Sequence, residues 1–331
     1  MVRAKEMRVL CFALLAAGLV LVPSLSGAVD FDKNVHYFQP PSDGSGILLT
    51  YGSEPLNWLG IHYGLYADEA IGHLVYRIPD TDEEKIIFKN QTGLNALVAV
   101  GITRFLNIGM SIPFVPYREF NQEFEDFYQE YRKEKLGELE DPNPDRFKET
   151  SKSTSPEDLR VDVKGIMFNR RARCVGLALN LGITIPVGLG QNSFLSDRNT
   201  TVAPRLIVDV GRYRWNVAFN VAYKIYGKER ESDFLDMRVK DEIIFGAGGK
   251  FRFLHSNELM LDSVFRTHAS DFFGDANEDY GEILGAYRYI FGNYTLVAFT
   301  VGFGMGVMEG AGTPSSRYFI GVTSYEYHLG F

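Results

Sequence analysis

Cysteine is almost absent from this chain of 331 residues, which contains only Cys11 and Cys174. Cys11 lies in an apolar run near the N-terminus, so the exported chain would hold one cysteine and no internal disulfide framework. After that run, no stretch reaches the roughly 18 uninterrupted apolar residues that a membrane helix needs. Basic residues are also in deficit, with a formal net charge of -8. These shortages argue against a disulfide-stapled scaffold, a helical inner-membrane protein and a nucleic-acid-binding protein.

The first 28 residues have the three parts of a secretory signal peptide. Arg3, Lys5 and Arg8 supply the positive charge, residues 9–22 form the apolar run, and residues 26–28 are small. We predict that residues 1–28 are a signal peptide and that the mature chain begins near residue 29 and is exported.

Apolar side chains then recur at every second position over many short segments. In residues 215–225 the odd positions carry Trp, Val, Phe, Val, Tyr and Ile, whereas the even positions are small or polar. A transmembrane β-strand needs this pattern, because one face meets lipid and the other faces the lumen. The mean hydropathy of -0.10 also suits a barrel, whose strands are apolar on one face only. The sequence predicts an all-β fold, an antiparallel up-and-down barrel in the outer membrane.

Twelve segments follow this pattern, with short turns alternating with longer loops. The predicted strands are residues 58–76, 86–102, 105–117, 159–169, 173–187, 201–211, 213–226, 242–253, 258–268, 281–291, 293–307 and 317–331. Fourteen strands would result if the long first segment bent into a hairpin and residues 46–53 formed a further strand. We assign residues 58–331 to the barrel and residues 29–57 to a periplasmic N-terminal segment, which would also be able to enter the lumen.

The last strand ends in four alternating apolar residues, Tyr325, Tyr327, Leu329 and Phe331. This stripe resembles the C-terminal signal that the barrel-assembly machinery reads. We therefore expect that machinery, outer-membrane lipid and lipopolysaccharide to be partners of the chain.

One predicted extracellular loop, residues 119–158, is much longer than the others. It holds 13 acidic and 6 basic residues, and aromatic residues spaced by three and four at its start predict an amphipathic helix. The loop would be a lid, a plug or a surface-binding segment, or simply a solvated loop that its charge keeps soluble. Binding of divalent cations that bridge lipopolysaccharide is a further hypothesis.

Strand parity directs many ionisable side chains into the lumen, and these are the candidate site residues. They are Arg160, Asp162, Lys164, Arg205, Asp209, Lys224, Glu242, Lys250, Arg252, Asp262, Arg266, Glu282, Arg288 and Glu326. In an open lumen they would create a field that guides polar solutes. In a narrow barrel they would pair with one another and fill the interior, which we favour slightly because small barrels have little spare room.

Catalytic chemistry has weak support in the sequence. His268 and Ser270 resemble the His-x-Ser of outer membrane phospholipase A, but Asp271 and Phe272 follow instead of Asn-Gly, and we identify no residue to orient the histidine. The histidines and Cys174 show no metal-ligand spacing. We predict no enzyme activity, no catalytic or metal site and no cofactor, with lipolysis a distant third possibility.

Several segments, among them residues 38–49 (FQPPSDGSGILL), 106–115 (LNIGMSIPFV) and 177–188 (LALNLGITIPVG), resemble the N-terminal barrel of large outer membrane protein A family members. The resemblance implies an outer-membrane barrel, here without the peptidoglycan-binding domain. We predict a narrow channel or transporter-like protein for small solutes. A long-chain fatty-acid transporter would be a special case, and a structural or surface-interaction barrel acting through its loops is the alternative.

Overall fold

The structure is a computed structural model that describes residues 34–77, 84–131, 155–187, 195–197, 199–227, 230–231, 238–274, 279–291, 297–308, 310 and 312–324. The predicted signal peptide, Glu326 and the predicted C-terminal assembly signal lie outside the described residues. So do residues 132–154 of the predicted acidic loop.

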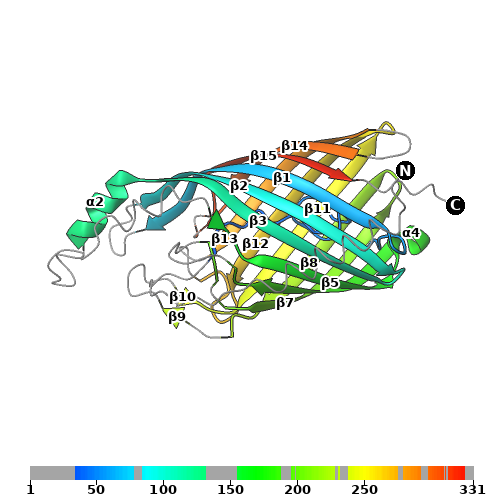
Figure 1. Cartoon of the computed structure of the whole chain (residues 1–331), viewed down its shortest axis with the longest axis horizontal. Coiled ribbons are helices and arrows are strands. Elements are labelled where there is room, and N and C mark those ends of the chain that lie inside the picture. Colours follow the sequence, from blue (N-terminus) through cyan, green and yellow to red (C-terminus); the bar gives the residue numbers. More distant parts are fainter. Residues whose placement is uncertain are drawn as a thin grey trace.

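Twelve long antiparallel strands close into one barrel (Figure 1). They are β1 (Ile61–Arg77), β2 (Glu84–Thr103), β3 (Leu106–Phe120), β5 (Leu159–Phe168), β6 (Val175–Ile185), β7 (Thr201–Arg212), β8 (Trp215–Lys224), β11 (Glu242–Phe253), β12 (Asn257–His268), β13 (Tyr280–Phe291), β14 (Val297–Gly306) and β15 (Ser316–Ser324). β15 pairs with β1, from Gly64 opposite Thr323 to Ile71 opposite Ser316, and this pairing closes the barrel. The prediction of twelve strands is confirmed. The fourteen-strand alternative is wrong, because residues 46–53 belong to no strand.

Three very short strands lie outside this wall. β4 (Ser155–Pro156) pairs with β3, where Phe114 lies opposite Pro156. β9 (Arg230–Glu231) and β10 (Arg238–Val239) pair with each other in a separate two-stranded sheet.

The two ends of the barrel differ, as the predicted asymmetry of turns and loops requires. At one end, which we call the turn end, β2 joins β3 through residues 104–105 and β5 joins β6 through the short helix α4 (Arg170–Arg173). The opposite end, which we call the loop end, holds the connections between β3 and β5, between β6 and β7 and between β8 and β11. β1 begins at the turn end, so the residues that precede it reach the wall there.

Helix α2 (Gln122–Tyr131) follows β3 and projects beyond the loop end (Figure 1). It confirms the amphipathic helix predicted at the start of the acidic loop. The Phe124 ring lies 6.0 Å from that of Phe120 and 6.1 Å from that of Phe127, between ring centroids, so this aromatic row attaches the helix to the end of the strand. No helix in the described part of the chain has the length and apolar character needed to cross a membrane.

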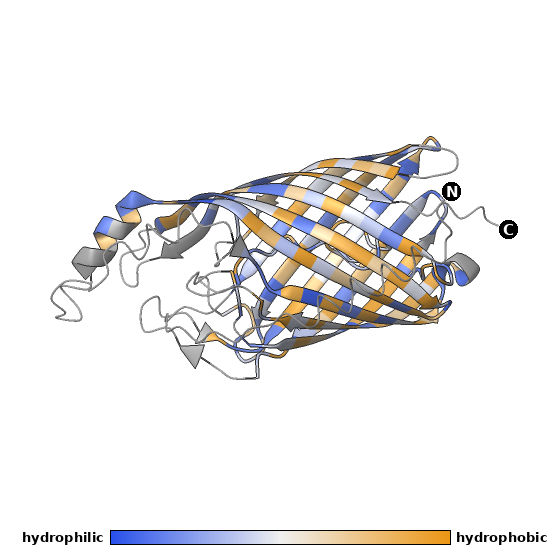
Figure 2. Ribbon diagram, viewed as in Figure 1, coloured by the Kyte–Doolittle hydropathy of each residue, from blue (hydrophilic) through white to orange (hydrophobic). Residues whose placement is uncertain are grey.

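The outer wall is apolar and exposed, whereas the inner wall is polar or small. On β8, Phe219 has 54% of its surface exposed, but the neighbouring Ala218 and Asn220 are buried. Figure 2 shows the same alternation of apolar and polar residues along the tilted strands. A closed barrel pairs its backbone groups between strands, and an exposed apolar outer face is stable only against lipid. The chain is therefore an integral outer-membrane β-barrel.

Candidate functional site

Residues 34–57, which we call the plug, run through the interior of the barrel without forming a helix or strand. Near the loop end, the backbone N–H of Asn34 donates to Asp197, which lies in the connection between β6 and β7. Near the turn end, the backbone N–H of Leu56 donates to the side chain of Asn107 on β3. We assign residues 29–57 to a periplasmic segment that would also be able to enter the lumen. Residues 34–57 lie in the lumen, where their side chains find apolar and ionic partners.

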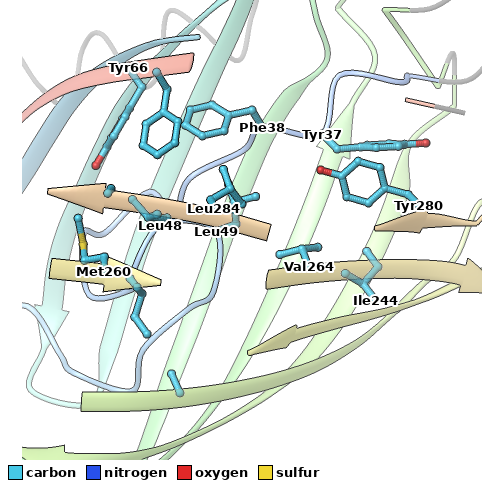
Figure 3. Packing of buried hydrophobic residues seen from close by; sticks show 14 of the residues in the cluster. Tyr37, Phe38, Leu48, Leu49, Tyr66, Ile244, Met260, Val264, Tyr280 and Leu284 are labelled. Carbon is cyan, nitrogen blue, oxygen red and sulfur yellow. The ribbon is translucent and has the colours of Figure 1, made fainter. Parts of the chain in front are cut away.

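An apolar cluster holds the middle of the plug inside the barrel (Figure 3). Phe38 is fully buried, and its ring centroid lies 5.0 Å from that of Phe319 and 6.1 Å from that of Tyr66. Leu48 and Leu49 pack in the same cluster, with wall residues such as Met260, Val264 and Leu284. The lumen of this barrel therefore contains a small hydrophobic core, and plug and wall both contribute to it.

A buried carboxylate on β12 binds the plug backbone at its tightest turn. The backbone N–H of Ile47 donates to the carbonyl of Thr50 (2.9 Å), which closes the turn. Inside it, the N–H groups of Leu48, Leu49 and Thr50 all donate to one oxygen of Asp262, at 2.9, 2.8 and 2.9 Å. The Thr50 hydroxyl donates to the other oxygen at 2.5 Å. Asp262 thus accepts hydrogen bonds from three buried backbone N–H groups of the plug, which have no neighbouring strand to pair with.

Lys164 on β5 donates hydrogen bonds to backbone carbonyl groups of the plug, whereas Asp262 accepts from its N–H groups. Its side chain is 2% exposed; the ammonium forms an ion pair with Asp43 and donates to the hydroxyl of Ser45 (2.8 Å). It also donates to the backbone carbonyls of Gly52 (3.0 Å) and Glu54 (2.9 Å). A buried ammonium in a lumen needs acceptors on several sides, and here the plug provides them.

Two further wall residues complete the attachment below the turn. The side chain of Asn220 on β8 accepts from the N–H of Tyr51 (2.6 Å) and donates to its carbonyl (3.0 Å), as a neighbouring strand would. Asp209 on β7 accepts from the backbone N–H of Ser53 (3.1 Å) and from its hydroxyl (2.5 Å), and it forms an ion pair with Arg170 of α4 (3.2 Å).

Near the loop end, the first residues of the plug meet a buried ionic cluster. His36 is fully buried; its Nδ1 lies 2.6 Å from a carboxylate oxygen of Glu157, and its Nε2 lies 3.1 Å from both oxygens of Asp68 on β1. Arg317 on β15 bridges Asp68 and Glu282 on β13, with an Nε to Oε1 distance of 2.8 Å to Glu282. This cluster joins the plug to three strands and to Glu157, which lies between β4 and β5.

A second polar cluster lies in the loops above β5 and β8. Lys224 Nζ lies 2.6 Å from an oxygen of Asp197, and the backbone N–H of Asp197 donates to Asp158 (2.6 Å). Burial, and after it the neighbouring Asp197 carboxylate, raises the pKa of Asp158 to about 7. Asp158 therefore binds its proton more tightly than a solvated aspartate does.

The structure places every candidate lumen charge that it describes on the inner side of its strand. Asp162, Lys164, Asp209, Asp262, Arg160 and Arg288 have hydrogen bonds or ion pairs with the plug or with the residues that hold it. Arg252 and Glu258 pair with each other on the wall, as do Arg266 and Glu242 at 3.9 Å. Some lumenal charges therefore hold the plug, and others pair with one another across neighbouring strands of the wall.

Sequence reasoning missed the residues that act from the plug and from the strand ends. His36, Asp43, Glu157 and Asp158 gave no periodic signal because they lie outside strands. Arg317 opens the predicted last strand, but the parity read from Tyr325 to Phe331 turns it towards lipid, whereas the structure buries it. Asp68 lies on β1, and we had considered a hairpin at this position.

The predicted catalytic alternative gains little from the structure. His268 is buried at the loop end of β12, opposite Glu242 in the β11 register, whereas Ser270 is exposed beyond the strand. Within the described residues, no group of histidine, cysteine, aspartate and glutamate side chains is arranged to hold a metal ion.

Plug, lumen and apolar outer wall define the class of the protein, a transmembrane barrel with a segment of its own chain inside. No protein-family model matches the chain, and no curated protein matches it. Among solved structures, it is similar to the COG4313 outer membrane channel of Pseudomonas putida F1, with a TM-score of 0.57, 11% identity, and coverage of 82% of this chain and 97% of that one. This likeness shows a shared barrel fold.

Two further solved structures give lower scores. The NanC porin has a TM-score of 0.49 and 9% identity, over 80% of this chain and 100% of that one. The toluene transporter TodX of Pseudomonas putida has a TM-score of 0.44 and 10% identity, over 88% and 98%.

Proposed function

We propose that this protein is a narrow outer-membrane channel for small solutes, and that movement of the plug controls passage through its lumen. The observation that carries the proposal is how the wall holds residues 34–57. Individual polar side chains of the wall, such as Asp262, Lys164 and Asn220, bind the plug, and the plug forms no β-pairing with the wall strands. Such contacts exchange with water one at a time, so the plug is able to leave while the barrel keeps its own strand pairing.

A disulfide between plug and wall tests this proposal directly. A Cβ at Gly246 on β11 would lie 3.7 Å from Thr50 Cβ, within the range of about 3.5–4.5 Å that a disulfide requires. Thr50→Cys with Gly246→Cys, in a Cys174→Ser background, should therefore fix the plug when oxidised. We expect single-channel openings in planar bilayers under reducing conditions and their loss on oxidation.

The matched control places a disulfide between two wall strands. A Cβ at Gly182 would lie 3.8 Å from Ala203 Cβ, and the two residues face each other in the β6–β7 register. Gly182→Cys with Ala203→Cys, in the same Cys174→Ser background, should form a disulfide that leaves the plug free, so oxidation should not abolish openings. Openings that persist when the plug is fixed would reject plug gating. Silence of the reduced protein, even when Asp262→Ala is added, would reject the channel and favour the surface-binding alternative.

The remaining sequence predictions belong to the same proposal. We infer that residues 1–28 are an export signal and that residues 325–331 engage the barrel-assembly machinery in a lipopolysaccharide-containing membrane. We infer further that the barrel has no enzymatic role. Kinship with the barrel of outer membrane protein A family members rests on the sequence segments described above.

A further inference from the structure

A cavity of about 60 Å³ separates the plug from one side of the wall. Its wall residues come from β5 to β8, β11 and β12, and the plug contributes residues such as Tyr37 and Tyr51. Six charged side chains line it, and cations outnumber carboxylates by two to one: Arg160, Arg205, Lys224 and Arg266 against Asp162 and Asp197.

Two of these cations already have carboxylate partners. Arg160 Nε lies 3.2 Å from an oxygen of Asp162, and Nη2 donates to the carbonyl of Pro40 (2.6 Å). Lys224 Nζ lies 2.6 Å from Asp197. Both carboxylates of the cavity are therefore engaged, and they leave no acceptor for the other two arginines.

Arg205 on β7 and Arg266 on β12 rest on aromatic rings instead. The guanidinium carbon of Arg205 lies 4.0 Å from the ring centroid of Tyr51, and that of Arg266 lies 4.1 Å from the ring of Tyr37. The Nε atom of each is buried and has no hydrogen-bond partner among the described residues. Glu242, the carboxylate paired with Arg266, is 3.9 Å away, beyond hydrogen-bond distance.

A buried guanidinium N–H without an acceptor raises the energy of the structure, and an anion would remove that cost. We propose that this cavity binds the oxyanion group of a small organic solute through Arg205 and Arg266. Two guanidinium forks reach the cavity from different strands, which suits an anion with two or more oxygens. The volume accommodates the carboxylate group itself, and the tyrosine rings offer an apolar surface to the few carbon atoms that follow it. The inference rests on the proposed channel and makes small organic anions its cargo.

Calorimetric titration of the refolded wild-type chain tests the site without requiring the channel to open. Butyrate, butyramide and butylammonium have the same length and differ in charge, so they serve as probes at constant ionic strength. We expect saturable binding of butyrate alone. Equal binding of the three probes, or no binding of butyrate, would overturn the proposal.

Substitutions locate the site within the lumen. Arg205→Gln should weaken butyrate binding at least tenfold, because it removes the guanidinium that lacks a carboxylate partner. Lys250→Gln, a matched loss of one lumenal cation outside the cavity lining, should change the affinity less than twofold. Equal losses in both variants would refute a localised site. Folding of each variant is checked by its heat-modifiable migration in gel electrophoresis. If a variant does not fold, the comparison of the three probes on the wild-type chain still tests whether the cavity binds an anion. Since binding is measured on the plugged protein, its failure is distinguishable from failure of the channel proposal.

Discussion

Removal of the Asp262 carboxylate should release the plug. Asp262→Ala leaves the N–H groups of Leu48, Leu49 and Thr50 without their acceptor, and it removes the partner of the Thr50 hydroxyl. All four groups belong to the plug, so the change acts on the plugged state and leaves the strand pairing of β12 intact.

The expected magnitude follows from these four bonds. Hydrogen bonds to a charged group contribute about 1.5 kcal/mol or more each, or roughly 6 kcal/mol together. Desolvation of the carboxylate, which the unplugged state regains, offsets several kcal/mol of this. A net loss of roughly 3 kcal/mol remains, which corresponds to a change of about 150-fold in the ratio of unplugged to plugged protein. Asp262→Asn keeps one acceptor oxygen and should give an intermediate effect.

Open probability in planar bilayers measures this ratio, and thermal unfolding of the barrel checks that the wall is intact. Glu258→Gln is the matched control, because Glu258 is a buried carboxylate on the same strand whose ion pairs are with Arg252 and Arg288 of the wall. If Asp262→Ala opened no more often than Glu258→Gln while both barrels stayed folded, the reasoning that Asp262 holds the plug would be refuted.

Two more predictions concern the wall and the loop end. Phe219→Arg should cost roughly 2–4 kcal/mol of barrel stability because the side chain faces lipid, whereas Asn220→Arg should spare the wall and displace Tyr51 from its two bonds; equal loss of barrel stability would contradict the assigned faces. Stability at the loop end should decrease as pH rises. The pKa of Asp158, raised to about 7, means that the folded loop end holds this proton more tightly than a solvated carboxylate would. The stabilisation that this proton contributes to folding is complete below about pH 4 and is lost as pH rises through 7. The thermal midpoint of the barrel should therefore fall from pH 5 to pH 8, and Asp158→Asn should reduce this fall; an unchanged fall in the variant would exclude Asp158 as its source.

The strands were predictable because their pattern is local. Along residues 215–224 each side chain is exposed or buried according to its parity, and one sequence segment contains all the information needed to see this. Short turns such as residues 254–256 between β11 and β12 are equally local. The inward direction of Asp262 or Lys164 therefore followed from the sequence, but the partners of these residues did not.

Those partners lie far away along the chain. Thr50 and Asp262 are separated by 212 residues, and Ser45 and Lys164 by 119. The plug carries no period that would reveal its destination, since it forms neither helix nor strand, and its composition suits a solvated leader as well as a lumenal segment. Whether residues 34–57 stayed in the periplasm or entered the barrel was therefore open at the level of sequence.

The sequence by itself determined the antiparallel barrel and the faces that most of its strands present, because alternation of side chains and the length of each segment fix these features locally. The choice of twelve strands over fourteen came from the structure, which leaves residues 46–53 outside any strand. Only the tertiary structure decided how the lumen is used. Burial of the wall's charges requires partners that satisfy them, and the folded barrel brings the plug's backbone, its histidine and its hydroxyl groups to those charges from distant parts of the chain.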